Sequence, residues 1–461
     1  MFNNEILQKL TEVCGNKHVK SDQATLLAYS YDSTSQFQAL PSAVISPKDK
    51  HEIASIVHIC NTYKIPIVPR GSGTNLCAGT TPLEGGIVLL FNRMNKIVEL
   101  DEKNLTITVQ PGVYTEAIAK AANHAGLFYP PDPGSIHISQ IGGNISENSG
   151  GLRGLKYGVT SDYVLGLEIV LPNGKIIQTG GKSAKDVAGY DLTALFTGSE
   201  GTLGVIVEAT LKLIPRPNTT KTMIALYHSI EDAAETVSQI IAHQIIPVTL
   251  EFLDQPTIQV VEDYAKIGLP TNAKAILMIE QDGDKHSVDK DIKNISQICE
   301  ENGAFEIKVA KTTEEAESLM TARRVALSAL SRLKPTTILE DATVPRSEIA
   351  NMVTFINFVA EKYNLMICTF GHAGDGNLHP TCLTDIRNTE EISKVEKAFE
   401  EIFKKAIELG GTITGEHGVG AMKMPYLSLK VGEAGIDVMR GIKNSIDPNH
   451  IMNPGKIFSR E

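Results

Sequence analysis

The sequence predicts an α+β protein with more than one domain, and three observations support that prediction. From about Pro41 to Pro69 the apolar pattern reads strand, helix, strand, and short antiparallel hairpins follow. Beyond Pro217 strands and helices alternate again, which is typical of two α+β repeats on one sheet. A chain of 461 residues also exceeds one ordinary core, so two or three domains are expected.

The composition is that of a globular enzyme and excludes several classes of protein. Hydrophobic residues make up 42% and charged residues 21%, with a formal net charge of -11. No Lys/Arg cluster offers the basic patch that nucleic acid requires. Six cysteines without a CxxC pair exclude a Cys-rich iron–sulfur motif and predict reduced thiols in a cytoplasmic protein. The chain shows no signal-peptide pattern and no apolar run of about 18 residues, so neither export nor a membrane span is expected.

The first part of the chain contains a glycine-rich loop at the end of a strand. Residues 1–35 are expected to form a helical arm, and residues 36–215 a first domain with strands at 43–45 and 65–69. The second strand runs into Arg70-Gly71-Ser72-Gly73-Thr74-Asn75, whose backbone N–H groups would form a nest for a pyrophosphate. The third glycine of GxGxxG is missing, which disfavours a nicotinamide-type Rossmann fold. A glycine-rich turn without a ligand is the alternative.

Hairpins and loops fill the rest of this domain. Predicted strands at 97–100 and 105–109 form one hairpin, and those at 167–171 and 175–179 form another. Residues 130–158 are so rich in glycine and proline that we expect no regular element there. Irregular loops of that length in a compact domain usually serve a function.

Five motifs in this order resemble the FAD-binding domain of the vanillyl-alcohol-oxidase-type (PCMH) flavoproteins. They are Pro69–Thr74, Pro131–Ser135, Gly142–Asn144, Gly150–Gly158 and Gly198–Gly204. The resemblance implies FAD with its pyrophosphate on the first loop. The residues assigned to FAD are Pro69, Arg70, Gly71, Ser72, Gly73, Thr74, Asn75, Pro131, Asp132, Gly134, Ser135, Gly142, Gly143, Asn144, Gly151, Tyr157, Gly158, Glu200, Gly204, Val205 and Asn453. Residues 69–79 contain no histidine for a covalent link, so we predict non-covalent FAD.

A second domain is predicted after Pro215-Arg216-Pro217, which interrupts the chain. Residues 216–425 resemble an α+β cap with ferredoxin-like split βαβ repeats. Its last predicted repeat includes a helix from Thr313 to about Leu333 that carries Arg323. A solvated helix face is the ordinary reading of such an arginine, and carboxylate binding is the functional one.

The stretch from Gly371 to Pro380 holds two histidines among glycines. Glycine costs about 1 kcal/mol in a helix interior, so we expect His372 and His379 on a tight, irregular loop that leaves a strand at 365–370. Asp375 lies between two glycines and is either a further ligand or a turn residue that bonds its own backbone.

A carboxylate and an imidazole follow the strand-like residues 411–414. Adjacent residues of an extended chain point to opposite sides, so Glu416 and His417 are expected to face different partners. His372, His379 and Glu416 together form a common ligand set for a divalent first-row metal with positions open to substrate.

The motifs Gly371–His379 and Gly415–Gly418 resemble the C-terminal signature of the FAD-linked D-2-hydroxy-acid dehydrogenases. That family includes D-lactate dehydrogenases, the flavoprotein subunit of glycolate oxidase and D-2-hydroxyglutarate dehydrogenases. The resemblance implies that His372, His379 and Glu416 hold one metal ion, which is zinc, iron or manganese, and that His417 is the catalytic base. It assigns Arg323 to the substrate carboxylate, and Thr381 is a further predicted substrate contact. Residues 426–461 resemble the return segment to the flavin domain, with a plain Pro/Asn/Gly chain stop as the alternative.

The resemblance implies oxidation of a small D-2-hydroxy acid to the 2-oxo acid. The metal lowers the pKa of the substrate hydroxyl, His417 takes its proton, and hydride passes to flavin N5. The apolar strand at 337–339 carries no lysine, which favours D-lactate first and glycolate next over 2-hydroxyglutarate.

No iron–sulfur, haem or nicotinamide motif is present, so the electron acceptor must be external. We expect an electron-transferring flavoprotein, with an iron–sulfur subunit or quinone as alternatives, and either a homo-oligomer or a hetero-oligomeric complex. The competing functions are a non-catalytic flavin electron carrier and an oxygen-using oxidase.

Overall fold

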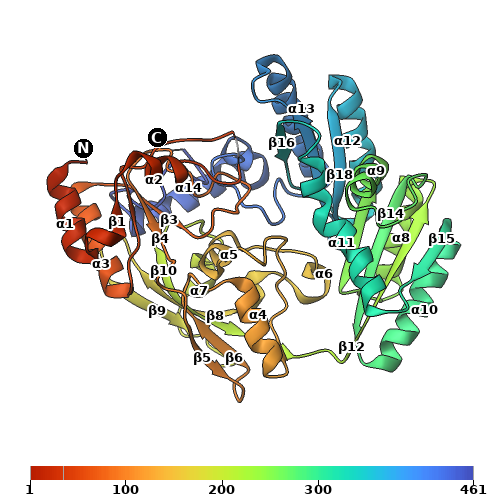
Figure 1. The fold of residues 1–461 in the computed structure, drawn as a ribbon, viewed down its shortest axis with the longest axis horizontal. Helices are drawn as coiled ribbons and strands as arrows, with labels where there is room; N and C mark the ends of the chain where they lie inside the picture. The colour runs from red at the N-terminus through yellow and green to blue at the C-terminus, as the bar shows by residue number, and fades with distance from the viewer. Residues whose placement is uncertain (1, 35, 460–461) are drawn as a thin grey trace. The chain divides into compact units, whose positions relative to one another are not determined.

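The computed structural model describes residues 2–34 and 36–459, and these form two compact units (Figure 1). Unit 1 comprises the chain up to Ser149 together with Val159–Arg216 and the residues from Glu416 onward. Unit 2 comprises Gly150–Gly158 and Pro217–Gly415. The outer ends of the predicted arm and of the C-terminal segment, at 1, 35, 460 and 461, lie outside the described residues. The domain boundaries at 35, 215 and 425 stay predictions.

Unit 1 starts with a four-stranded sheet in the order β1-β2-β4-β3. Strands β2, β4 and β3 are parallel and almost wholly buried, which explains their continuous apolar sequences. Helices α1 and α3 lie side by side (Figure 1), and the Asp49 carboxylate caps α3 by accepting the N–H groups of His51 and Glu52. The elements are α1 (Asn4–Cys14), β1 (Val19–Lys20), α2 (Gln23–Ala28), β2 (Ala43–Ile45), α3 (Lys50–Tyr63), β3 (Ile67–Arg70) and β4 (Ile87–Leu90).

A five-stranded antiparallel sheet in the order β5-β6-β10-β8-β9 continues unit 1. Both predicted hairpins are present in it. The elements are β5 (Ile97–Asp101), β6 (Thr106–Val109), α4 (Thr115–His124), β7 (Leu127–Phe128), β8 (Val164–Val170), β9 (Ile176–Gly180), α7 (Leu192–Phe196), β10 (Val205–Lys212) and β11 (Ile214–Pro215).

The expectation that residues 130–158 hold no regular element is wrong. Two short helices form there, α5 (Ile141–Glu147) and α6 (Gly154–Tyr157). Tertiary packing explains one of the two glycines in α5, because a Cβ on Gly142 would come within 2.7 Å of the Pro111 Cβ. The glycine therefore permits close contact with the neighbouring backbone and does not mark a break in the helix.

The end of the chain returns to the first sheet of unit 1. After α14 (Leu427–Ile446), Met452 pairs with Ile67 in a parallel bridge. Lys443 is buried, and its Nζ donates to the Asp447 carboxylate and to the Met452 carbonyl oxygen. A buried ion pair with these hydrogen bonds fixes the turn that directs the last segment onto β3.

Unit 2 is built on an eight-stranded sheet with the path β15-β12-β14-β13-β18-β19-β16, and β17 pairs with β19. Helices α12 and α13 lie side by side (Figure 1). The strands are β12 (Thr219–Tyr227), β13 (Thr249–Asp254), β14 (Ala275–Gly283), β15 (Ala304–Val309), β16 (Thr336–Leu339), β17 (Ala342–Thr343), β18 (Met366–His372) and β19 (Asn377–Thr384). The helices are α8 (Ile230–Ala242), α9 (Gln255–Ala265), α10 (Lys285–Glu301), α11 (Thr313–Leu330), α12 (Ile349–Tyr363) and α13 (Thr389–Glu408).

The histidine motif does not form the irregular loop expected from its glycines. His372 is the last residue of β18 and His379 lies within β19, so both belong to one antiparallel hairpin with a short turn at 373–376. Gly371 fits this hairpin because a Cβ there would come within 2.3 Å of the Asn377 carbonyl oxygen on the facing strand. The glycines therefore allow close strand pairing and a tight turn.

Among the residues that the structure describes, no helix combines the length and the apolar character needed to cross a membrane.

Candidate active site

The β18-β19 hairpin collects polar and aromatic side chains on one face of the unit 2 sheet. His372 pairs with Asn377 and Phe370 pairs with His379 across the hairpin. Residues two apart on a strand, and residues directly opposite in an antiparallel pair, project to the same face. The register therefore places His372, Phe370 and His379 on one side of the sheet.

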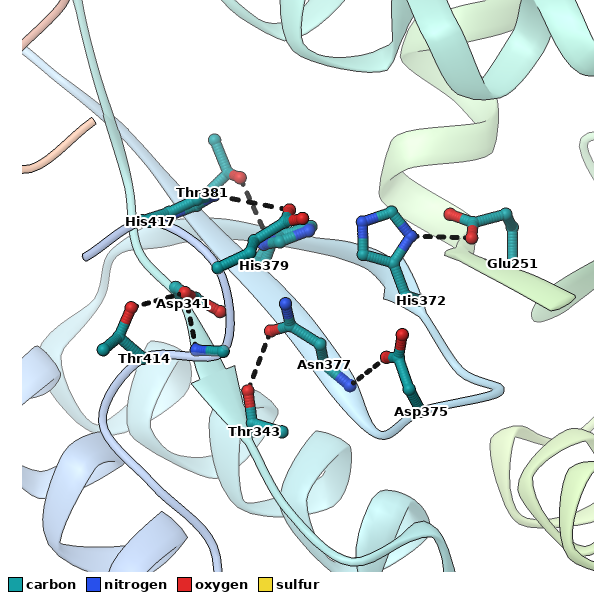
Figure 2. Close-up of polar contacts among 12 residues, drawn as sticks. Glu251, Asp341, Thr343, His372, Asp375, Asn377, His379, Thr381, Thr414 and His417 are labelled. Atoms are coloured by element: carbon teal, nitrogen blue, oxygen red, sulfur yellow. Dashed lines mark hydrogen bonds and ion pairs between the residues drawn. The ribbon is translucent and has the colours of Figure 1, made fainter. Parts of the chain in front are cut away.

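The two histidines form a compact, buried pair (Figure 2). Their ring centroids are 5.1 Å apart and their planes meet at 89°. His372 and His379 are 6% and 2% exposed, respectively. Two adjacent imidazoles offer nitrogen ligands that suit zinc, iron or manganese, so these two of the three predicted ligands fit a divalent metal.

Glu251 on β13 connects His372 to the predicted substrate arginine. The register between β13 and β18 pairs Phe252 with Gly371, so the next position along sets Glu251 opposite His372. One carboxylate oxygen accepts from His372 Nδ1 at 2.7 Å, and the other accepts from Arg323 Nε at 2.5 Å. Burial alone would raise the pKa of Glu251, but His372 and Arg323 together hold it below its ordinary value.

Arg323 lies on α11 and faces the hairpin. Its guanidinium stacks over the Phe370 ring at 4.7 Å, and its side chain is only 11% exposed. This placement excludes the solvated helix face that the sequence left open. Within the described chain Arg323 Nη1 and Nη2 donate no hydrogen bond, and a guanidinium in this state can bind a carboxylate through both nitrogens.

The other two predicted residues of the hairpin make local contacts. The hydroxyl of Thr381, which lies on β19 and is fully buried, donates to the His379 carbonyl oxygen at 3.1 Å. Asp375 lies in the turn, where its carboxylate accepts the N–H of Asn377 at 3.2 Å. Arg346 donates from Nε to the Gly374 carbonyl oxygen and fixes the same turn. Asp375 thus has the turn-forming contact that was the alternative to a ligand role.

The segment that leads to Glu416 and His417 is anchored at its start within unit 2. The Asp341 carboxylate accepts the hydroxyl of Thr414 and the N–H of Gly415, both at 2.8 Å (Figure 2). A Cβ on Gly415 would come within 2.4 Å of the Thr343 hydroxyl oxygen, so the chain can approach β17 this closely only as glycine. The residue directly before the predicted ligand Glu416 is thereby fixed.

Glu416 and His417 are the first residues of the C-terminal part of unit 1. The expectation that they face opposite sides is wrong, because His417 Nε2 lies 3.8 Å from a Glu416 carboxylate oxygen. The chain bends here, and the alternation of an extended strand does not apply. Glu416 and His417 therefore belong to unit 1, whereas His372 and His379 belong to unit 2.

Glu200 fixes the backbone that follows His417. Its carboxylate accepts the N–H groups of Val419 and Gly420 at 2.7 and 2.6 Å. Burial raises the pKa of Glu200, although these N–H donors oppose the shift. Asn453 donates from Nδ2 to the carbonyl oxygens of Glu200 and Gly79 at 2.7 and 2.9 Å. Both predicted FAD residues therefore organise backbone inside unit 1.

The glycine-rich loop after β3 has the properties of an anion-binding nest. In the part of the chain that is described, the backbone N–H groups of residues 71–77 donate to no protein acceptor. Arg70 donates to the Tyr31 carbonyl oxygen at 2.7 Å, and it lies under Gly73, where a Cβ would come within 2.4 Å of its Nη2. Asp32 accepts from the Thr80 N–H and the Asn75 amide. Available N–H donors on a braced loop fit the pyrophosphate of FAD.

The remaining residues assigned to FAD divide between the two units. Most lie in unit 1, on the loop around Asp132, in α5 and at the start of β10. Gly151, Tyr157 and Gly158 belong to unit 2. There the Tyr157 hydroxyl and Lys156 Nζ donate to Asp282, at 2.8 and 2.5 Å. The structure therefore does not gather all of the assigned residues into one unit.

Neither Glu251 nor Asp341 was predicted from the sequence to belong to the site. A signal was available for Glu251, because it is the central charge in the otherwise apolar run Thr249–Leu253, and a charge at a buried strand position needs a partner. No comparable pattern indicated Asp341, which is buried next to a second carboxylate between two short strands.

Two family models match the chain. The "FAD linked oxidases, C-terminal domain" model covers residues 216–457, and the "FAD binding domain" model covers residues 41–180. Among solved structures, p-cresol methylhydroxylase matches with a TM-score of 0.83 over 99% of this chain and 97% of its own, at 19% identity. These matches confirm the predicted vanillyl-alcohol-oxidase-type α+β fold.

Curated relatives match over nearly the whole length. "Glycolate oxidase subunit GlcD" of Bacillus subtilis (strain 168) is 63% identical over 100% of this chain and 98% of its own. The protein of the same name from Escherichia coli (strain K12) is 35% identical over 98% and 90%. "D-lactate dehydrogenase" of Anaerostipes hadrus is 35% identical over 98% and 97%. The chain therefore belongs to the FAD-linked oxidase family and is an FAD-dependent oxidoreductase of the GlcD and D-lactate dehydrogenase type.

Proposed function

We propose that the protein oxidises a small 2-hydroxy acid to the 2-oxo acid, with FAD as oxidant and a divalent metal held by His372, His379 and Glu416. The observation that carries the proposal is the buried histidine pair beside Arg323, whose Nη groups are available, on one face of the hairpin. We take Glu416 as the third ligand from the family signature, and it directly follows the anchored Gly415 in the chain. The GlcD and D-lactate dehydrogenase relatives make glycolate and D-lactate the two candidate substrates.

The proposed site residues have separate parts in this reaction. Bound FAD supplies the hydride acceptor and the bound metal supplies a Lewis acid that lowers the pKa of the substrate hydroxyl. Arg323 holds the substrate carboxylate through Nη1 and Nη2. His417 accepts the hydroxyl proton, since an imidazole is the side chain that most often serves as a general base. The hydrogen on C2 leaves with its electron pair, so the substrate loses one proton and one hydride.

The unit 2 sheet favours a short substrate side chain. On the face of the sheet that carries His379, strand β16 presents Leu339, which is buried and apolar, and the strand carries no lysine. A second carboxylate on a longer 2-hydroxy acid would need a cationic or hydrogen-bonding partner there. This supports glycolate or D-lactate over D-2-hydroxyglutarate.

Anaerobic flavin reduction tests the proposed reaction. Purified protein with bound FAD is mixed separately with glycolate, D-lactate, L-lactate and D-2-hydroxyglutarate, and the visible flavin absorbance is followed. We expect glycolate or D-lactate to bleach the flavin at least tenfold faster than D-2-hydroxyglutarate. No bleaching by any of the four acids would refute the reaction and favour a non-catalytic electron carrier.

We further propose that the electrons leave through a separate protein, with an electron-transferring flavoprotein as the candidate acceptor. The relatives named as subunits of glycolate oxidase support an assembly in which a partner takes the electrons. The substrate-reduced protein should transfer electrons to the flavoprotein faster than to oxygen or a soluble quinone. Stoichiometric peroxide formation at a faster rate would instead favour an oxidase.

A further inference from the structure

Glu251 links a predicted metal ligand to the predicted substrate arginine. Its side chain is 1% exposed, one oxygen lies 2.7 Å from His372 Nδ1, and the other lies 2.5 Å from Arg323 Nε. We propose that Glu251 is a positioning residue that orients His372 toward the metal and Arg323 toward the substrate carboxylate at the same time. This inference rests on the proposed function and adds the residue that couples its two binding events.

The contact with His372 determines which ring nitrogen is available. A carboxylate accepts hydrogen bonds and donates none when ionised, so Nδ1 of His372 must carry the proton. The lone pair of the neutral ring is then on Nε2, away from Glu251. Carboxylates that fix metal-ligating histidines in this way set both the tautomer and the ring orientation.

The contact with Arg323 determines the direction of the guanidinium fork. Glu251 engages Nε, and Phe370 covers one face of the guanidinium plane at 4.7 Å. With one edge and one face occupied, Nη1 and Nη2 are left to bind a ligand. Because both contacts use the same rigid carboxylate, the distance between the metal ligand and the carboxylate-binding fork is fixed by one residue on β13.

An amide at position 251 could satisfy only one of these two donors. Glutamine has a single acceptor oxygen, and its NH₂ group is a donor. The oxygen should stay with Arg323, since hydrogen bonds from a charged donor are the stronger ones. The NH₂ group would then donate to Nδ1 of His372, and the proton would move to Nε2, where it blocks metal binding.

The test compares wild type with Glu251→Gln, both as full-length protein with bound FAD. After a chelator has removed the metal, ¹⁵N NMR of labelled histidines at about pH 9, where imidazole is neutral, reports the tautomer of His372. A His372→Gln spectrum identifies its signals. We expect the Nδ1–H form in wild type and the Nε2–H form in Glu251→Gln. Zinc affinity, measured by chelator competition, should fall about 10- to 100-fold, and KM for glycolate or D-lactate should rise.

Two further variants separate positioning from general damage to the core. Asp254→Asn makes the same chemical change on the same strand, but its carboxylate serves Thr257 and Thr369 and does not contact His372. It should leave the His372 tautomer and zinc affinity unchanged. Glu251→Asp keeps two acceptor oxygens and should recover part of the zinc affinity lost in Glu251→Gln.

An Nε2–H form of His372 in wild type, or an unchanged tautomer and zinc affinity in Glu251→Gln, would overturn the inference. Failure of the proposed metal site has a different signature. If His379→Ala binds zinc as tightly as wild type while the tautomer still depends on Glu251, the orientation of His372 by Glu251 stands and the metal assignment fails.

Discussion

The glycine-rich loop of unit 1 and the β18-β19 hairpin of unit 2 present their functional groups in opposite ways. In the loop the candidate groups are backbone N–H donors, and side chains hold the loop through Arg70, which donates to the Tyr31 carbonyl oxygen, and Asp32, which accepts the Thr80 N–H. In the hairpin the candidate groups are side chains, and the paired backbone sets their spacing. Side-chain changes in the hairpin should therefore remove the chemistry and leave flavin bound. Substitutions that constrain the loop backbone should weaken flavin binding and leave the side chains of the hairpin site intact.

The largest effect is expected from loss of a hairpin histidine. His379→Ala should lower metal content to background and turnover by about 10³-fold, since a Lewis acid contributes several kcal/mol to such a reaction. Elemental analysis and steady-state rates measure the two quantities. FAD content should remain that of wild type. Parallel loss of FAD would show that the two regions do not act separately.

Removal of the predicted base should come next. His417→Ala should keep both FAD and metal and lose about 10²-fold in turnover, at the lower end of the usual contribution of a general base. Flavin spectra, metal analysis and rates check the three parts of this prediction. Turnover near that of wild type would exclude His417 as the base.

Protonation of Asp254 should make the stability of the hairpin sheet depend on pH. Burial raises the pKa of Asp254 from 3.8 to about 6. The protonated folded form therefore contributes stability that is complete below pH 3.8 and is lost as the pH rises through 6, about 3 kcal/mol in all. Asparagine does not titrate, so the unfolding free energy of wild type minus that of Asp254→Asn, measured by urea unfolding, should fall by about 3 kcal/mol as the pH rises through that range. A difference independent of pH would contradict the shift.

A backbone change in the loop should give the smallest effect, on flavin alone. Gly73 has a φ of +73°, and a Cβ there would meet the Arg70 guanidinium at 2.4 Å. Gly73→Ala should weaken FAD binding about tenfold, from roughly 1–2 kcal/mol of backbone strain with added collision. Gly85→Ala is the matched control, since Gly85 has a φ of +70° and open space around it. Equal FAD affinities in the two variants would argue against the nest.

The sequence predicted the family and the fold class better than the local structure. The order of glycine motifs and of histidines indicated the family and the FAD-binding fold, which the comparisons confirm. The predicted irregular segments around Gly142 and Gly371 are a helix and a hairpin, because glycine there permits close backbone contact and does not break the element. Glu251 lies 121 positions from His372, so only the register of β13 against β18 could join them. The individual roles of the site residues stay predictions.

The most direct test of a catalytic metal at His372 and His379 is anaerobic flavin reduction by glycolate or D-lactate before and after metal removal. The protein is stripped with a chelator, checked for retained FAD, and then reconstituted with zinc, manganese or iron(II). Stripping is expected to slow flavin reduction at least a hundredfold, and one of the metals should restore the rate. Flavin reduction at the original rate in the metal-free protein would contradict the claim that His372 and His379 hold a catalytic metal.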